Sequence, residues 1–384
     1  MTQLDTGRSR NGISRRSSLK LVAGAAAASI VGLGNMSTGR AGSPSATPLR
    51  DLAASRGLAI GTDYYENYRL PHLDLLDTFL GREYNLILLD YAWWRGIQVQ
   101  QYGFRNLRPS AKEWDFTFLD ASVEYAVAHD MRIRGGLLGG APPWLTEAHL
   151  SPTDARSQLV DSVNTIVGRY KGVVSEWIAI NEYFWYPPGQ PSGNIWFDAL
   201  GESYVDLTCE TARRADPDAR LILSNFMNLQ PGFGADFDAT QVRRLKAEGL
   251  VDMYGFQTHL AGESPPDPAA FTQVLRQFQA LGVEVVITEM DVNLRNLDGA
   301  LPAKLATEAK IYDEVLRAYF GVGGRSVSFF GPTDFFSWLG ANAYGTMWDA
   351  DSQPKPAFFA AEAAIEAVPE VSGYRRFAPG LASD

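Results

Sequence analysis

The chain has 384 residues, of which 46% are hydrophobic and 12% aromatic, and its formal net charge is −10. A chain of this length and apolar content can bury a large core, and barrels of roughly 250 residues or more fold as one domain. The acidic balance disfavours nucleic acids and anionic membranes as partners, and it is compatible with a neutral ligand. Cys209 is the only cysteine, which excludes an internal disulfide.

Residues 1–43 have the pattern of an export signal. Residues 14–20 contain two adjacent arginines, and a segment rich in Ala, Gly and Val follows at 21–34. This order of charge, apolar run and small residues predicts export by the twin-arginine route to the periplasm or the extracellular space, with cleavage near 41–46. The alternative is a disordered tail that happens to contain two arginines. Removal of the segment takes away six basic residues and one acidic residue, which leaves 28 basic and 43 acidic residues and a net charge of −15.

After residue 50, short β-rich runs alternate with longer amphipathic stretches. The expected strands are 58–61, 86–89, 131–138, 174–180, 221–224, 253–256, 283–288 and 326–330. The expected helices lie near 71–80, 117–129, 153–170, 200–215, 239–249, 269–281, 303–319 and 355–367. Eight strands in strict alternation with eight helices predict an α/β fold, a (β/α)8 TIM barrel in a single domain.

An open, doubly wound sheet is the alternative architecture. No glycine-rich phosphate loop follows an early strand, which weakens a nucleotide-binding version of that sheet. We therefore expect a catalytic barrel over residues 58–367, with an N-terminal lead-in at 44–57 and a C-terminal tail at 368–384.

Two of the expected strands stop abruptly at a glutamate. The apolar run 174–180 is followed by Asn181 and Glu182, and the run 283–288 is followed by Glu289. A carboxylate at the end of a buried strand is costly without a partner or a task, and active sites of α/β barrels lie at the carboxyl ends of the strands. Glycoside hydrolysis requires two carboxyl groups, one protonated toward the leaving oxygen and one ionised toward the anomeric carbon. The alternative is two separate, salt-bridged glutamates.

Polar neighbours strengthen this interpretation. The amide of Asn181 could bond a sugar hydroxyl next to the reacting carbon. Gln257 and His259 follow the sixth strand, and Asp291 lies two residues beyond Glu289. A histidine bonded to both Glu289 and Asp291 would orient the nucleophile and hold it ionised.

The segments around these residues resemble the signature strands of family 10 glycoside hydrolases, the β-1,4-xylanase family. The three segments are WIAINE at 177–182, GFQTHL at 255–260 and ITEMDV at 287–292. Residues 331–338, with Asp349 and 354–357, resemble the eighth strand and closing helix of that family, and 131–135 resembles its third strand. The resemblance runs from about residue 58 to 367.

The resemblance implies a retaining mechanism. By matching position, Glu182 would be the general acid/base and Glu289 the nucleophile. His259 and Asp291 would tune Glu289, and Asn181 would hold the 2-hydroxyl. The resemblance implies neither a metal nor a cofactor, and we expect a monomer that binds a polysaccharide or oligosaccharide and, once the signal is removed, no membrane.

The chain departs from the family in three loops. The usual His-Thr-Leu-Val-Trp-His segment after the third strand is replaced by a shorter GLLGGA at 136–141. After the second strand, Trp93 stands where the family has a lysine that contacts the sugar, and the usual Asn-Asp after the fifth strand is Asn225-Phe226. A site that hydrogen-bonds its substrate rejects analogues that lack the bonded groups. Because these donors are missing, the sequence does not specify which sugar the site accepts.

Aromatic residues at or just past the strand ends are candidates to line the sugar site, because flat rings stack on sugar faces. The candidate substrate contacts are Asp90, Trp93, Trp94, Trp144, Tyr183, Trp185, Asn225, Trp338 and Trp348, although several of the rings could merely pack loops. Glu176 is expected to be a surface charge at a strand start. Arg95, Arg105 and Arg108 could meet an acidic decoration on the substrate, with a solvated basic patch as the alternative.

The sequence thus predicts a secreted, retaining, xylanase-like endo-β-1,4-glycosidase that cleaves a β-linked plant-type polysaccharide. One alternative is a retaining glycosidase for a different β-glycan or for a short or decorated β-glycoside. Another is a non-catalytic sugar-binding barrel. The pairing of Asn181-Glu182 with Glu289 argues against that last alternative, because a binding protein has no need of both an acid and a nucleophile.

Overall fold

The structure of the protein is a computed structural model that describes residues 47–64, 79–89, 107–146, 150–183, 194–226 and 229–371. The chain divides into two compact units, Met1–Ala41 and Gly42–Asp384, and all described residues belong to the second. Its strands are β1 (Ala59–Tyr64), β2 (Leu86–Leu89), β3 (Arg132–Gly135), β4 (Glu176–Asn181), β5 (Arg220–Asn225), β6 (Met253–Phe256), β7 (His259–Ala261), β8 (Glu284–Asn293) and β9 (Ser326–Phe329). Its helices are α1 (Leu49–Ser55), α4 (Thr117–Ala128), α5 (Pro143–Thr146), α6 (Pro152–Arg169), α7 (Ile195–Leu200), α8 (Ser203–Ala215), α9 (Phe233–Ala247), α10 (Pro268–Gln279), α11 (Leu301–Gly321) and α12 (Pro356–Glu366), with 3-10 turns η1 (Asp334–Phe336) and η2 (Ala341–Ala343).

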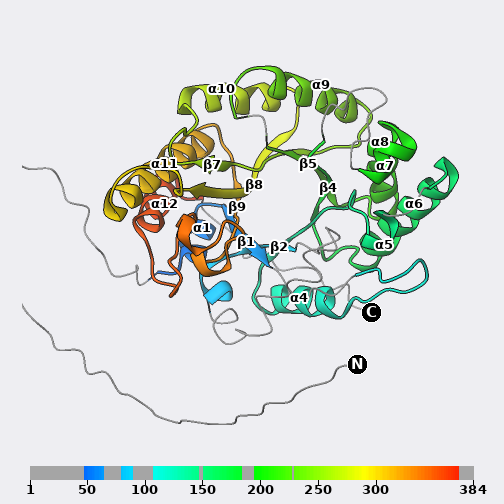
Figure 1. Cartoon of the computed structure of the whole chain (residues 1–384), viewed down its shortest axis with the longest axis horizontal. Coiled ribbons are helices and arrows are strands. Elements are labelled where there is room, and N and C mark those ends of the chain that lie inside the picture. The colour runs from blue at the N-terminus through cyan, green and yellow to red at the C-terminus, as the bar shows by residue number, and fades with distance from the viewer. Residues whose placement is uncertain are drawn as a thin grey trace, which may run out of the picture. The chain divides into compact units, whose positions relative to one another are not determined.

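Eight of the strands close into a parallel barrel. They follow one another around the ring in the order β1, β2, β3, β4, β5, β6, β8 and β9, and β9 pairs with β1 to complete it. The helices lie outside this ring (Figure 1). The short strand β7 is additional and pairs with β8. The predicted TIM barrel is therefore confirmed.

Helix starts follow from local chemistry. Ser151 caps α6, because its hydroxyl accepts the backbone N–H of Asp154 at 3.1 Å and a proline follows at the first helical position. Asp267 caps α10 in the same way and accepts the N–H of Ala270 at 2.8 Å. The side-chain caps therefore define the first residues of α6 and α10.

The predicted and observed elements differ mainly at their ends. The third strand, expected over 131–138, stops at Gly135, although the backbone N–H groups of Gly136 and Leu138 still donate to β2 and β4. Strand β8, expected to end at 288, continues to Asn293 because β7 pairs with its last residues. The extended β8 carries both Glu289 and Asp291. The helix expected near 71–80 lies almost entirely outside the described residues.

Two apolar layers hold the barrel together. A large cluster lies between the strands and the helices, and a small cluster of Leu88, Ile178, Ile222, Met253 and Val286 comes from five different strands. Inward-facing residues of a TIM barrel pack in such layers and fill its interior. Of the helices in the described ranges, none is long and apolar enough to cross a membrane.

Arg134 of β3 ties distant strands together through buried hydrogen bonds. Its guanidinium donates to Glu176 Oε1 at 2.7 Å, to Ser326 Oγ at 2.6 Å and to the Ile287 carbonyl at 3.1 Å. These partners belong to β4, β9 and β8, so one side chain links four strands. The prediction that Glu176 is a surface charge is wrong, because Glu176 is buried and paired. A buried carboxylate requires such a partner.

Replacing Arg134 by Met should lower the free energy of unfolding by about 3–5 kcal/mol, since it leaves a buried carboxylate unpaired. The matched control is Arg317→Met, which removes the partner of Asp313 from a largely exposed pair at 2.7 Å. That variant should lose less than about 1 kcal/mol. Urea denaturation measures both. Equal stabilities of the two variants would show that the Arg134 pair does not support the barrel.

Candidate active site

Strand β8 carries two carboxylates that hold one histidine between them. Glu289 and Asp291 are two residues apart, so both side chains lie on the same side of the strand. The backbone of His259 pairs with that of Asp291 in the β7–β8 register. His259 Nε2 lies 3.1 Å from Glu289 Oε2, and its Nδ1 lies 3.0 Å from Asp291 Oδ1. The Nδ1 contact has the distance of an ion pair without the alignment of a hydrogen bond. The expected bridging of both carboxylates by His259 is thus present.

The electrostatics of this arrangement favour a charged imidazole. Burial alone would lower the pKa of His259, but the attraction of Asp291 and Glu289 raises that pKa to about 10. His259 is therefore an imidazolium at neutral pH, and it places a positive charge beside Glu289.

Trp338 completes the surroundings of His259. Its indole Nε1 donates to Asp291 Oδ2 at 2.6 Å, and its ring lies edge-on to the imidazole with centroids 5.1 Å apart. Phe330 packs on the same imidazole with centroids 5.2 Å apart. Trp338 nonetheless keeps 60% of its surface exposed. Its N–H can therefore hold Asp291 while its ring faces outward. The sequence predicted the ring as a substrate contact but not the hydrogen bond to Asp291.

Glu182 follows β4 in an unusual backbone conformation. Its φ angle is +53°, a left-handed value that costs roughly 1–2 kcal/mol for a residue with a Cβ atom. Its backbone N–H donates to the Ser224 carbonyl at 2.9 Å. The side-chain amide of Gln257 donates to Asn181 Oδ1 at 3.1 Å and to Glu182 Oε1 at 3.3 Å. Gln257 thus holds both residues of the predicted Asn-Glu pair.

One three-residue segment joins the two glutamates. Gln257 contacts Glu182, and His259, two residues later, contacts Glu289. Thr258 between them has φ +46°, and its carbonyl accepts the N–H of Asp291 at 3.4 Å. The segment leads from β6 to β7 at the carboxyl ends of the strands. The structure therefore brings together the six predicted residues Asn181, Glu182, Gln257, His259, Glu289 and Asp291.

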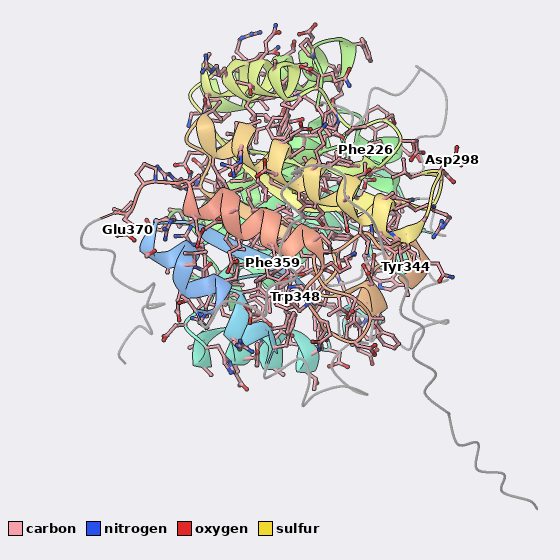
Figure 2. All side chains as sticks on the ribbon, turned by 90° about the vertical axis from the view of Figure 1, so that its left-hand side faces the viewer. Phe226, Asp298, Tyr344, Trp348, Phe359 and Glu370 are labelled. Carbon is pink, nitrogen blue, oxygen red and sulfur yellow. The ribbon has the colours of Figure 1, made fainter. Side chains whose placement is uncertain are left out.

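Other predicted site residues have different surroundings. Tyr183, Asn225 and Trp348 are buried, so their positions do not support a direct contact with a sugar. Tyr183 stacks on Phe237 with centroids 5.6 Å apart. Trp348, labelled in Figure 2, packs against Phe79 and Phe358 with centroids 4.8 and 4.6 Å away. Residues that follow a strand end can turn back into the layer between sheet and helices, which a position in the sequence does not reveal.

Trp144 and Arg108 form a separate pair. The indole of Trp144 donates to the Arg108 carbonyl at 2.8 Å, and the Arg108 guanidinium lies 5.6 Å from the centre of its ring. Arg108 is buried and donates to Ser162 Oγ at 2.7 Å and to Asp161 Oδ2 at 2.6 Å. Arg108 was predicted either to belong to a solvated basic patch or to bind an acidic group on the substrate. Both predictions are wrong, because Arg108 is buried. The predicted residues Asp90, Trp93, Trp94, Trp185, Arg95 and Arg105 lie outside the described residues.

Sequence reasoning missed three contributors. Ser224 of β5 and Thr288, the residue before Glu289 in β8, are joined by a hydroxyl contact of 2.9 Å. Asp238 of α9 is buried beside Asn225, and no motif in the sequence marked it. Within the described ranges, no group of three or more His, Cys, Asp or Glu side chains is arranged to hold a metal ion.

Comparison with known proteins gives a consistent family. The model of glycosyl hydrolase family 10 matches residues 98–364. Endo-1,4-beta-xylanase B of Thermotoga neapolitana is 27% identical over 83% of this chain and 92% of its own length. Endo-1,4-beta-xylanase C of Phanerodontia chrysosporium is 31% identical over 66% of this chain and 68% of its own length, whereas endo-1,4-beta-xylanase A of T. neapolitana is matched over 25% of its length. The crystal structure of native xylanase 10B from Thermotoga maritima matches with a TM-score of 0.74 and 26% identity, over 83% of this chain and 98% of that one.

The stabilisation provided by His259 should be lost as the pH rises. Its pKa is about 10 in the folded protein against an ordinary value of 6.5, so the stabilisation is complete below about pH 6.5 and falls as the pH passes through about 10. We expect the free energy of unfolding to fall by a few kcal/mol across this window. Denaturant unfolding at a series of pH values measures the fall.

His259→Gln should flatten this pH dependence, because the amide does not titrate. The matched control is His129→Gln, which replaces a histidine whose ring contacts the Tyr125 carbonyl at 2.8 Å. The control should keep the full pH dependence. An unchanged slope in His259→Gln would show that the charge on His259 does not stabilise the fold.

Proposed function

Since the chain belongs to glycosyl hydrolase family 10 and is a glycoside hydrolase, we propose that it is an exported, retaining endo-β-1,4-glycosidase that cleaves a xylan-type polysaccharide. The observation that carries the proposal is the pair of glutamates, Glu182 directly after β4 and Glu289 within β8. Gln257 holds Glu182 and the imidazolium of His259 holds Glu289, so the two carboxyl groups have different surroundings. Two carboxyl groups can act as a general acid and as a nucleophile when their surroundings differ in this way.

The first chemical step forms a covalent intermediate. Glu289, paired with the His259 imidazolium, attacks the anomeric carbon while protonated Glu182 gives its proton to the leaving oxygen. The glycosidic bond breaks, and an ester bond forms between the sugar and Glu289. This step requires the two carboxyl groups to lie roughly 5–5.5 Å apart.

The second step releases the sugar. Glu182, now ionised, takes a proton from a water molecule, which attacks the anomeric carbon and displaces Glu289. The two inversions give a product with the original β configuration. Asn181 supports both steps through the sugar 2-hydroxyl. Its Oδ1 accepts from Gln257, which leaves the Nδ2 hydrogens for the substrate.

The choice of a xylan-type substrate rests on relatives. Several are named endo-1,4-beta-xylanases, and xylanase 10B of Thermotoga petrophila, 25% identical with a TM-score of 0.74, has been solved with xylobiose. The exposed ring of Trp338 beside His259 offers a face on which a sugar can stack. A different β-glycan is the second candidate, because Trp93 replaces the lysine that contacts the sugar in the family. Product analysis on xylan beside other β-glycans separates the two.

Export is the remaining part of the proposal, and residues 14–20 support it. Replacing Arg15 and Arg16 by Lys should leave a full-length precursor in the cytoplasm, because the twin-arginine route requires the arginine pair. Cell fractionation with N-terminal sequencing measures location and cleavage. The matched control replaces Arg8 and Arg10 by Lys and should leave export intact. Normal export of the Arg15/Arg16 variant would overturn the assigned route.

Variants of the two glutamates test the mechanism. Glu289→Ala should lower kcat by several orders of magnitude even with an activated aryl β-glycoside, because the nucleophile is gone. Added azide should restore turnover and give an α-glycosyl azide, the inverted product. Full activity of Glu289→Ala would overturn its assignment.

The loss of kcat/KM in Glu182→Ala should depend on the leaving group of the substrate. With a dinitrophenyl glycoside kcat/KM should change little, whereas with a poor leaving group it should fall by about 10²–10⁴-fold, the typical contribution of a general acid. The matched control is Glu284→Ala, which removes an exposed carboxylate at the other end of β8, paired with Arg220 at 2.8 Å. That variant should keep activity on both substrates.

A further inference from the structure

The strained backbone at Glu182 is held on both sides by the end of strand β5. The N–H of Glu182 donates to the Ser224 carbonyl at 2.9 Å, and the carbonyl of the next residue, Tyr183, accepts from Asn225 Nδ2 at 2.8 Å. A left-handed φ at a residue with a Cβ atom persists only where the surrounding structure enforces it. Here the last two residues of β5 supply that enforcement.

Asn225 is fixed in one orientation. Its Oδ1 accepts the backbone N–H of Phe226 at 2.9 Å, and Nδ2 donates to Asp238 Oδ1 at 3.1 Å as well as to the Tyr183 carbonyl. The amide therefore cannot rotate without breaking several bonds at once. Phe226, which is labelled in Figure 2, is exposed and directly follows the last residue of β5.

Asp238 anchors Asn225 to the outer layer of the barrel. It lies in α9, it is 1% exposed, and its second oxygen accepts a short hydrogen bond from the hydroxyl of Tyr254 in β6. Its neighbour Phe237 stacks on the ring of Tyr183 with an interplanar angle of 11°. Helix α9 thus holds Tyr183 twice, by its ring through Phe237 and by its carbonyl through Asn225.

From these contacts we propose that Asn225 and Asp238 are positioning residues for Glu182, and the proposal rests on Glu182 acting as the general acid/base. Neither residue touches the reacting atoms. Release of the Tyr183 carbonyl would let the backbone at Glu182 relax from φ +53° toward ordinary values, which would move the carboxyl group away from the leaving oxygen. Glu289 is held by His259 of β7, and Trp338 holds Asp291, so neither of these contacts runs through Asn225 or Asp238.

The test compares leaving groups, because only a misplaced acid distinguishes between them. Asn225→Ala should lower kcat/KM for a poor leaving group, such as an unsubstituted phenyl xylobioside, by about tenfold or more relative to a dinitrophenyl xylobioside, since small misplacements cost up to about 10²-fold. Asp238→Ala should act in the same direction. Asp238→Asn, which keeps an oxygen to accept from Asn225, should restore most of the lost activity on the poor substrate.

Two reference variants make the outcome decisive. Tyr319→Phe removes a buried hydroxyl that donates to the Ser326 carbonyl at 2.9 Å at the other end of the barrel, and it should lower stability without changing the ratio of the two rates. Equal losses on both substrates in Asn225→Ala would overturn the positioning role and leave the assignment of Glu182 intact. If Glu182→Ala itself shows no dependence on the leaving group, then the proposed function fails at that residue, and the positioning role fails with it.

Discussion

The attraction between the His259 imidazolium and the two carboxylates of β8 is the interaction on which the site depends. Glu289 and Asp291 are both largely buried in the last part of one strand, where carboxylates are unstable without a compensating charge. The histidine supplies that charge, and strand β7 delivers it because its register sets His259 opposite Asp291. The extension of β8 beyond the barrel has its physical reason here. Because β7 pairs with Asp291–Asn293, β8 continues beyond Met290, its last residue paired with β9.

The barrel balances charge at its interior as well as at its mouth. Arg134 and Glu176 form a buried pair among the strands, with two serines of β9 also accepting from the guanidinium. Buried pairs gain little stability over an apolar core, but removal of one partner is strongly destabilising. The pair therefore constrains which strands can neighbour one another, since Arg134 finds all its acceptors only when β3, β4, β8 and β9 surround one interior. We take this to favour the closed ring over an open sheet of the same strands.

Much of this architecture could be predicted from the sequence, because it follows from local patterns. The apolar β-branched runs predicted the strands. Two of these runs are followed by Glu182 and Glu289, which indicated the end of the barrel where the site lies. What could not be predicted depends on the direction of single side chains. Glu176 was predicted to be a surface charge but faces the interior, and Trp348 was predicted to line the sugar site but is buried in the core. Asp238 lies on a helix outside any motif, and only the fold brings it to Asn225.

The division between strands and connecting segments separates the parts of the site that the barrel fixes from the parts that can vary. Asn181, Gln257 and His259 lie on or next to barrel strands, where backbone pairing fixes their positions to within hydrogen-bond tolerance. The segment 136–141, by contrast, lies in the connection between β3 and α5. Connections tolerate substitution because few other residues depend on their geometry. A chain with this barrel can thus change its connecting segments while Asn181, Gln257 and His259 keep their positions.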